Sequence, residues 1–120
     1  MVRNVTILTL ILFLSIGTQI FADEKLIPDN EASKYIGEPV SVKGFVANVF
    51  QSQKGNVFLN FGKPYPNQTF AAVIFSKDTS KFNNIKGYEG KIVVVTGTVQ
   101  LYKGHPEIII NNPGQIKIAK

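Results

Sequence analysis

Two long segments of the sequence alternate apolar and polar residues with a period of two, and each has a glycine near its middle. In residues 40–46 this glycine is Gly44, and in residues 91–102 it is Gly97. The alternation is typical of a strand with one buried face, and an internal glycine marks a bulge or a sharp bend. Strands that bend in this way favour a small sheet closed on itself, because closure removes the exposed edges.

Three shorter apolar segments complete a set of five predicted strands. They are residues 57–61, 70–75 and 108–110, and turn-forming residues separate them, with residues 115–118 as a last short extended piece. On residues 91–102 the period of two places one set of side chains on a single face. We expect these side chains to form the core: Val93, Val95, Val99 and Leu101.

Two segments predict short helices. Residues 29–37 begin with two residues that can cap a helix and end in a glycine, and Pro39 prevents the helix from continuing. Residues 76–90 interrupt the strand pattern between the third and fourth strands. There Ser76 or Asp78 is suited to cap a second short helix.

The order of these elements is strand, strand, strand, helix, strand, strand. This order predicts an all-β domain with the OB-fold, a five-stranded Greek-key barrel in which the helix between strands three and four closes one end. The short helix at residues 29–37 precedes the first strand. The alternative is a small β-sandwich, which does not call for a helix at that point.

The first 22 residues have the pattern of a secretory signal peptide. Arg3 precedes an apolar stretch, and charge resumes at Asp23 directly after Ala22. We therefore expect residues 1–22 to be a signal peptide and residues 23–120 to be the OB-fold domain, exported to the periplasm or secreted. The alternative is an uncleaved membrane anchor, since this stretch is close to the length of a spanning helix.

The composition excludes most enzyme chemistries. With no cysteine and one histidine, the chain has no disulfide, thiolate zinc site, cysteine nucleophile or multi-histidine metal site. A nuclease of the thermonuclease type needs clustered carboxylates and an arginine. Here Arg3 is the only arginine, and Asp78, Glu89 and Glu107 have no motif spacing. We expect no enzyme activity, no cofactor and no metal site.

Three parts of the sequence resemble small OB-fold proteins of the helicase- and tRNA-anticodon-binding type. They read ASKYIGEPVSVKG from Ala32, VFLNFGKPYPNQTFAAVIF from Val57 and YEGKIVVVTGTVQLYKGHPEIII from Tyr88. The third part contains the pattern G-x-V-x-x-Y-x-G-x-P-x-I, here Gly97, Val99, Tyr102, Gly104, Pro106 and Ile108. The resemblance implies binding of single-stranded DNA or RNA.

OB-folds bind ligands across strands two and three, between the loop after strand one and the loop before strand five. A nucleic-acid surface there needs aromatic side chains for stacking and cations for the phosphates. The candidate ligand-binding residues are the aromatic Phe45, Phe58, Tyr65 and Tyr102, the cationic Lys43, Lys54, Lys63 and Lys103, and Asn60 and His105. The alternatives are that the two phenylalanines pack beneath loops and that His105 is an exposed turn residue.

Two functions without catalysis remain open. The formal net charge of +5 favours binding of nucleic acid. The leader, and the absence of arginine after it, favour an exported module that binds a protein, a glycan or a small ligand, because arginine is the usual partner of phosphate. Binding through phosphates weakens steeply as the salt concentration rises, so salt dependence separates the two.

Overall fold

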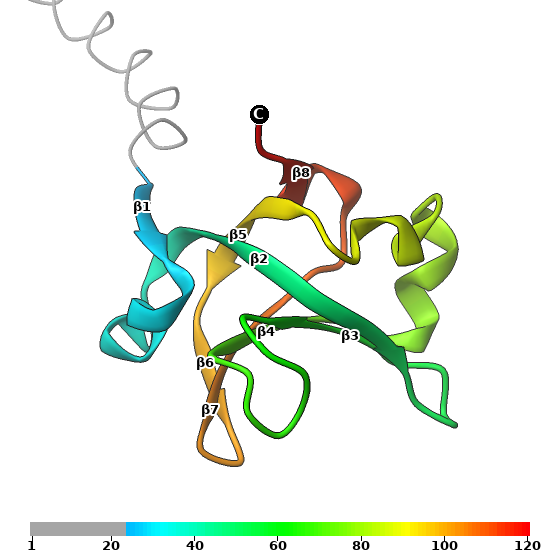
Figure 1. Ribbon diagram of the computed structural model, residues 1–120, viewed down its shortest axis with the longest axis horizontal. Coiled ribbons are helices and arrows are strands. Elements are labelled where there is room, and N and C mark those ends of the chain that lie inside the picture. The colour runs from blue at the N-terminus through cyan, green and yellow to red at the C-terminus, as the bar shows by residue number, and fades with distance from the viewer. Residues whose placement is uncertain (1–23) are drawn as a thin grey trace, which may run out of the picture.

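The computed structural model describes residues 24–120, which form one mixed sheet of eight strands with four short 3₁₀ helices (Figure 1). The strands are β1 (Lys25–Pro28), β2 (Pro39–Gln51), β3 (Val57–Phe61), β4 (Phe70–Ile74), β5 (Ile92–Thr98), β6 (Gln100–Tyr102), β7 (His105–Ile109) and β8 (Ile116–Ile118). The helices are η1 (Asp29–Tyr35), η2 (Ser76–Lys81), η3 (Ile85–Tyr88) and η4 (Pro113–Gln115). The predicted signal peptide, residues 1–22, lies outside the described residues. Within residues 24–120, no helix has the length and apolar character needed to cross a membrane.

The long strand β2 organises the sheet because it pairs with three neighbours. Its first part pairs with β5 and, in parallel, with β1, and its last part pairs with β3. A register shift between Val46 and Asn48 divides the two parts. We expected a bulge or a bend at Gly44, but the bulge lies further along the strand. A Cβ atom at Gly44 would lie 2.7 Å from Asp29 Oδ1 and 2.8 Å from Phe61 Cδ2, so glycine is needed there for close approach.

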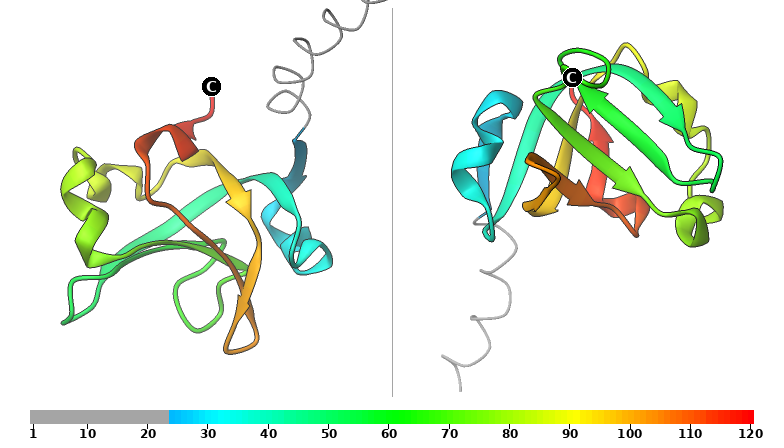
Figure 2. Two further views of the ribbon diagram at one scale, coloured as in Figure 1. Left: turned by 180° about the vertical axis from the view of Figure 1, so that it is seen from behind. Right: turned by 90° about the horizontal axis from the view of Figure 1, so that it is seen from below.

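The sheet, in the order β6-β7-β4-β3-β2-β5-β8, curls until β5 and β7 meet (Figure 2). A Cβ atom at Gly97 would lie 2.6 Å from Ile108 Cγ2, so only glycine lets these strands cross so closely. A bridge between Ile36 and Val99 adds a further link near the crossing. The result is an OB-like fold in which β4 and β7 are parallel neighbours.

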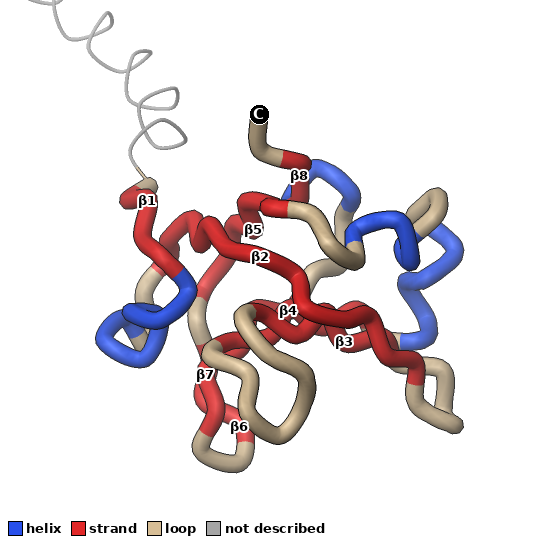
Figure 3. Tube along the Cα trace, in the orientation of Figure 1, coloured by secondary structure: helices blue, strands red, loops and turns tan. Residues whose placement is uncertain are grey.

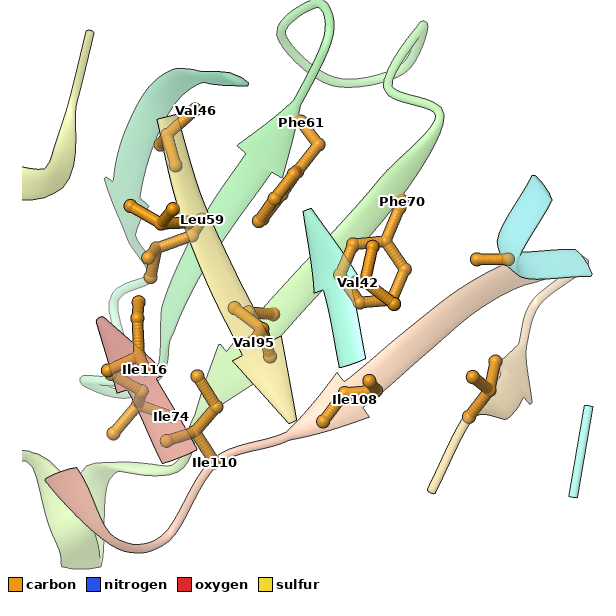
Figure 4. Close-up of a cluster of buried hydrophobic side chains, with 14 of the residues drawn as sticks. Val42, Val46, Leu59, Phe61, Phe70, Ile74, Val95, Ile108, Ile110 and Ile116 are labelled. Atoms are coloured by element: carbon orange, nitrogen blue, oxygen red, sulfur yellow. The ribbon is translucent and has the colours of Figure 1, made fainter. Parts of the chain in front are cut away.

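The inward-facing side chains form one apolar core (Figure 4). Phe61 of β3 and Phe70 of β4 make an edge-to-face contact, with ring centroids 5.0 Å apart. Val93, Val95 and Val99 are buried, as the alternation predicted. Leu101 is 57% exposed, so its predicted core position is wrong. The strand predicted over residues 91–102 ends at Thr98 in the structure. Leu101 lies on β6, which pairs only with β7 at the edge of the sheet.

The predicted count of five strands is also wrong. The structure adds β1, which pairs with β2, and it divides residues 91–102 into β5 and β6. The predicted extended piece at residues 115–118 is confirmed as a strand, β8, which pairs with β5. β1 has too few alternating residues to give a pattern of its own.

Helical turns occur where the sequence predicted them, but all are of the 3₁₀ type (Figure 3). In residues 29–37 the helix is η1, which has no side-chain cap. In residues 76–90 there are two helices, η2 and η3, in place of one, and neither Ser76 nor Asp78 caps them. Such short segments are typical of 3₁₀ helices, whose hydrogen bonds are less favourable than those of an α-helix.

Candidate functional site

The outer face of β3 carries the main pocket of the described chain. Val57, Leu59 and Phe61 point into the core, so Phe58 and Asn60, which alternate with them, lie on the opposite face. A pocket of about 530 Å³ opens there, a volume typical of ligand sites. Its lining residues are Asn48, Phe50, Phe58, Asn60, Pro64, Tyr65, Gln68, Tyr102, Lys103, His105 and Glu107.

Two segments supply lining residues that wall the pocket, and both project from the sheet on the same side in Figure 1. One is the β6–β7 hairpin, whose turn residues Lys103 and Gly104 both have positive φ, as a tight two-residue hairpin turn requires. The other is the β3–β4 loop, residues 62–69. The amide of Gly62 donates to the carbonyl of Phe45 at 2.9 Å, and the Thr69 hydroxyl donates to Asp29 of η1. From the sequence we expected the loop after the first barrel strand to form the second wall. In the structure, Pro64, Tyr65 and Gln68 of the β3–β4 loop line the pocket instead.

Aromatic rings line the upper part of the pocket. Phe50 and Phe58 are cross-strand partners with ring centroids 6.4 Å apart and planes tilted by 34°. Tyr65 and Tyr102, one from each wall, are 71% and 53% exposed. Lys103 Nζ lies 5.3 Å from the ring centroid of Tyr102. Exposed rings of this kind offer stacking surfaces to a planar ligand.

The floor of the pocket is polar. Asn60 is only 3% exposed, and its Nδ2 atom donates to Oδ1 of Asn48 at 3.1 Å. Gln68 Oε1 is buried and accepts no hydrogen bond within the described residues. A buried acceptor without a partner lowers the stability of the fold.

Glu107 adds an ionisable group to the floor. It lies on β7 directly beside Ala71 of β4. Burial raises the pKa of its carboxyl from 4.5 to about 7, because the charged form loses hydration there. The pocket thus holds a carboxyl group that changes charge near neutral pH.

Six of the ten residues named from the sequence line this pocket together: Phe58, Asn60, Tyr65, Tyr102, Lys103 and His105. The other four, Phe45, Lys43, Lys54 and Lys63, do not line it. Phe45 precedes the β2 bulge and lies beside Ile92 of β5. Lys43 lines a smaller hollow of about 270 Å³ with Leu26, Ile27 and Pro28.

Sequence reasoning missed five lining residues: Asn48, Phe50, Pro64, Gln68 and Glu107. Asn48 and Phe50 follow the β2 bulge, where the simple period of two no longer applies. Glu107 had a readable signal, because it is a single acid within the apolar segment 106–110 of the sequence. Among residues 24–120, no three acidic or histidine side chains gather as a metal site would require.

The sequence matches no protein-family model and no curated protein. In structure, the chain is similar to the aspartyl-tRNA synthetase of Entamoeba histolytica, with a TM-score of 0.54 and 16% identity over 79% of this chain and 21% of that one. It is similar to the asparaginyl-tRNA synthetase of Pyrococcus horikoshii, with a TM-score of 0.53 and 16% identity over 78% of this chain and 23% of that one.

A third similar structure is OBody AM1L10 bound to hen egg-white lysozyme, with a TM-score of 0.54 and 19% identity over 82% of this chain and 96% of that one. The chain thus spans nearly all of the OBody but less than a quarter of each synthetase. At these identities the likenesses show a shared fold, and that fold is OB-like.

Proposed function

We propose that this chain is a non-enzymatic OB module that binds single-stranded nucleic acid in the pocket on β3. The observation that carries the proposal is the arrangement of exposed rings above a polar floor. Phe58 and Tyr102 offer surfaces on which unpaired bases stack, and Asn60 and Gln68 offer amides for base edges. The fold shared with parts of two tRNA synthetases supports the same function.

The pocket favours contacts to bases over contacts to phosphates. Lys103 is the only lysine in its lining, to which neither Lys54 nor Lys63 belongs. Each phosphate contact to a single strand contributes a slope of about −0.7 to the logarithmic dependence of affinity on salt. We therefore expect a shallow salt dependence, corresponding to roughly one or two phosphate contacts.

Fluorescence anisotropy of a labelled single-stranded oligonucleotide, titrated with the full chain at two salt concentrations, tests this function. We expect saturable binding that weakens modestly at the higher salt concentration. A duplex of the same sequence is the matched control, and it should bind more weakly because its bases are stacked and paired. Absence of saturable binding to the single strand at low salt would exclude the proposed function.

The second candidate function is binding of a protein, a glycan or a small ligand. One observation favours a protein: the OBody, which this chain matches over 96% of its length, is bound to lysozyme in its structure. A polypeptide bound through apolar contacts would keep its affinity at high salt, whereas a nucleic acid would lose affinity with the slope of roughly one or two phosphate contacts. The same pocket residues are the expected contact surface in both cases.

We also propose that the leader is a signal peptide and that the domain acts after export. The support is the basic, apolar and small-residue pattern of residues 1–22, followed by acidic residues. Mass spectrometry of the protein from its native cell should find a chain that begins at Asp23. Recovery of an intact chain beginning at Met1 from the membrane fraction would indicate an anchor instead.

A further inference from the structure

The β3–β4 loop, residues 62–69, forms one wall of the pocket and is closed by hydrogen bonds at two levels. Within the loop, the amide of Asn67 donates to the carbonyl of Pro64 at 2.9 Å, which closes a turn. At the base of the loop, the amide of Thr69 donates to the carbonyl of Phe61 at 3.0 Å. A contact made at this base from elsewhere in the chain can therefore set the position of the whole wall.

Asp29, the first residue of η1, makes such a contact. Its carboxylate accepts a hydrogen bond from the Thr69 hydroxyl. A Cβ atom at Gly44 would lie 2.7 Å from Asp29 Oδ1, and a Cβ atom at Gly62 would lie 3.1 Å from Thr69 Oγ1. Glycine at both positions therefore leaves the room that the Asp29–Thr69 pair occupies between β2 and the loop.

Asp29 does not line the pocket, but Gln68, the residue before Thr69, does. Because Gln68 and Thr69 are adjacent, the backbone that Asp29 holds through Thr69 also carries Gln68 into the lining. A wall that is ordered before binding has less conformational freedom to lose when a ligand arrives. Loss of the Asp29–Thr69 hydrogen bond should therefore weaken binding although no contact to the ligand is removed.

We propose that Asp29 is a positioning residue of the pocket, which fixes the β3–β4 loop through Thr69 and so raises the affinity for a ligand that Asp29 does not touch. This inference rests on the proposed function, because it takes single-stranded nucleic acid as that ligand. It gives β1 and η1 a part in the site, although both precede the five strands predicted from the sequence.

Anisotropy titrations of the full chain with a labelled single-stranded oligonucleotide test this role. Asp29→Ala should weaken binding by about three- to tenfold, the size expected when groups in one hydrogen-bonded network are uncoupled. Asp29→Asn keeps an oxygen that accepts from the Thr69 hydroxyl, so its affinity should stay within about twofold of the wild-type value. Glu31→Ala removes the other acid in the first turn of η1 and is the matched control, with unchanged affinity expected.

Thr69→Val removes the donor of the same hydrogen bond and should weaken binding as much as Asp29→Ala does. In the double variant the two losses should not add, because each single change already breaks the bond. Additive losses would show that the two side chains act separately, and the proposal would then be wrong.

Hydrogen exchange of backbone amides, followed by NMR, gives a readout that does not depend on the ligand. In Asp29→Ala the amides of Asn67 and Thr69 should exchange several-fold faster than in the wild-type chain, and in Glu31→Ala they should not. Unchanged exchange in Asp29→Ala, or an equal loss of affinity in Glu31→Ala, would overturn the proposal.

The proposed function fails separately from this inference. If the wild-type chain does not bind the oligonucleotide at all, nucleic acid is not the ligand. The exchange rates of Asn67 and Thr69 then decide by themselves whether Asp29 fixes the wall.

Discussion

Two regions of this molecule bury an acidic side chain, and the pKa values of the two carboxyl groups shift in opposite directions. In η2 the side chain of Asp78 is 4% exposed, and Lys77 Nζ and Lys81 Nζ contact its carboxylate oxygens at 2.8 and 2.9 Å. Hydrogen bonds from Lys77 and then Lys81 hold the pKa of Asp78 below its ordinary value. In the pocket Glu107 has no such partner, and burial raises the pKa of its carboxyl.

The difference indicates what each region does. The 3₁₀ segment, residues 76–88, supplies its acids with partners: Glu89, directly after it, accepts from the amide of Val49 at 2.8 Å and from Lys86 Nζ at 3.2 Å. Such an arrangement fixes the segment against β2. The pocket leaves Glu107 and Gln68 Oε1 without partners, which is typical of a site that a ligand completes.

Truncation of Phe82 should have the largest effect, and this effect should be on stability and not on binding. Phe82 follows η2 and is 9% exposed in the core. Phe82→Ala leaves a cavity and should lower the free energy of unfolding by about 3–5 kcal/mol. Urea denaturation measures this loss. At low temperature, where the variant remains folded, its affinity for a single-stranded oligonucleotide should equal that of the wild-type chain. A matching loss of affinity would place the 3₁₀ segment in the binding site.

Truncation of Phe58 should weaken binding of the oligonucleotide rather than lower stability. Stacking on one aromatic ring contributes about 1–3 kcal/mol per base, so Phe58→Ala should weaken binding by roughly ten- to a hundredfold in the anisotropy titration. Phe45→Ala is the matched control, because Phe45 is 46% exposed on β2 but lies outside the pocket lining. Equal losses from both variants would show that the ligand covers a wider face than the pocket.

Replacement of Glu107 should raise stability at alkaline pH. A carboxyl whose pKa is higher in the folded chain than in the unfolded one makes folding less favourable as pH rises from about 4.5 to about 7. Glu107→Gln removes this cost and should stabilise the fold at pH 8 by about 1–2 kcal/mol, after allowance for solvent screening at a half-buried site. At pH 4 the variant and the wild-type chain should melt at the same temperature. Thermal unfolding that shows no gain at pH 8 would mean that Glu107 is fully hydrated.

Replacement of Asp78 should have the smallest effect, and the effect should be a loss of stability that is present at neutral pH and disappears at acidic pH. Its lowered pKa contributes stability that is present above its ordinary pKa of 3.8 and is lost as pH falls through the lower folded value. Asp78→Asn should therefore melt below the wild-type chain at pH 7, and the difference should shrink as the pH falls below 3.8. A difference in melting temperature that stays constant with pH would mean that the lysine contacts contribute nothing through charge.

Much of the fold can be predicted from local patterns. The alternation along β2 and β5 assigns most of the core correctly, because a buried face imposes a period of two on any strand. The two internal glycines mark close approaches, although at Gly44 the cause is Asp29 and Phe61 and not a bulge. The side chain of Leu101 breaks the pattern because β6 extends past the core, which local alternation does not reveal.

The candidate site is only partly readable from the sequence. Phe58 and Asn60 follow from the alternation on β3, whose inner residues are clearly apolar. The place of Gln68 in the pocket depends on how the β3–β4 loop folds over the sheet. The place of Glu107 depends on the parallel pairing of β4 with β7. Both are contacts between segments far apart in the chain, so no local pattern encodes them.

The central claim is that the pocket on the outer face of β3, between the β3–β4 loop and the β6–β7 hairpin, binds single-stranded nucleic acid. The most direct measurement is a titration of the ¹⁵N-labelled chain with a short single-stranded oligonucleotide, followed through backbone amide shifts. We predict saturable shifts at Phe58, Asn60 and Glu107, which line the pocket, with Asp78 and Phe82 unchanged. Shifts confined to the 3₁₀ segment, or no saturable shift at the three pocket residues, would contradict the claim.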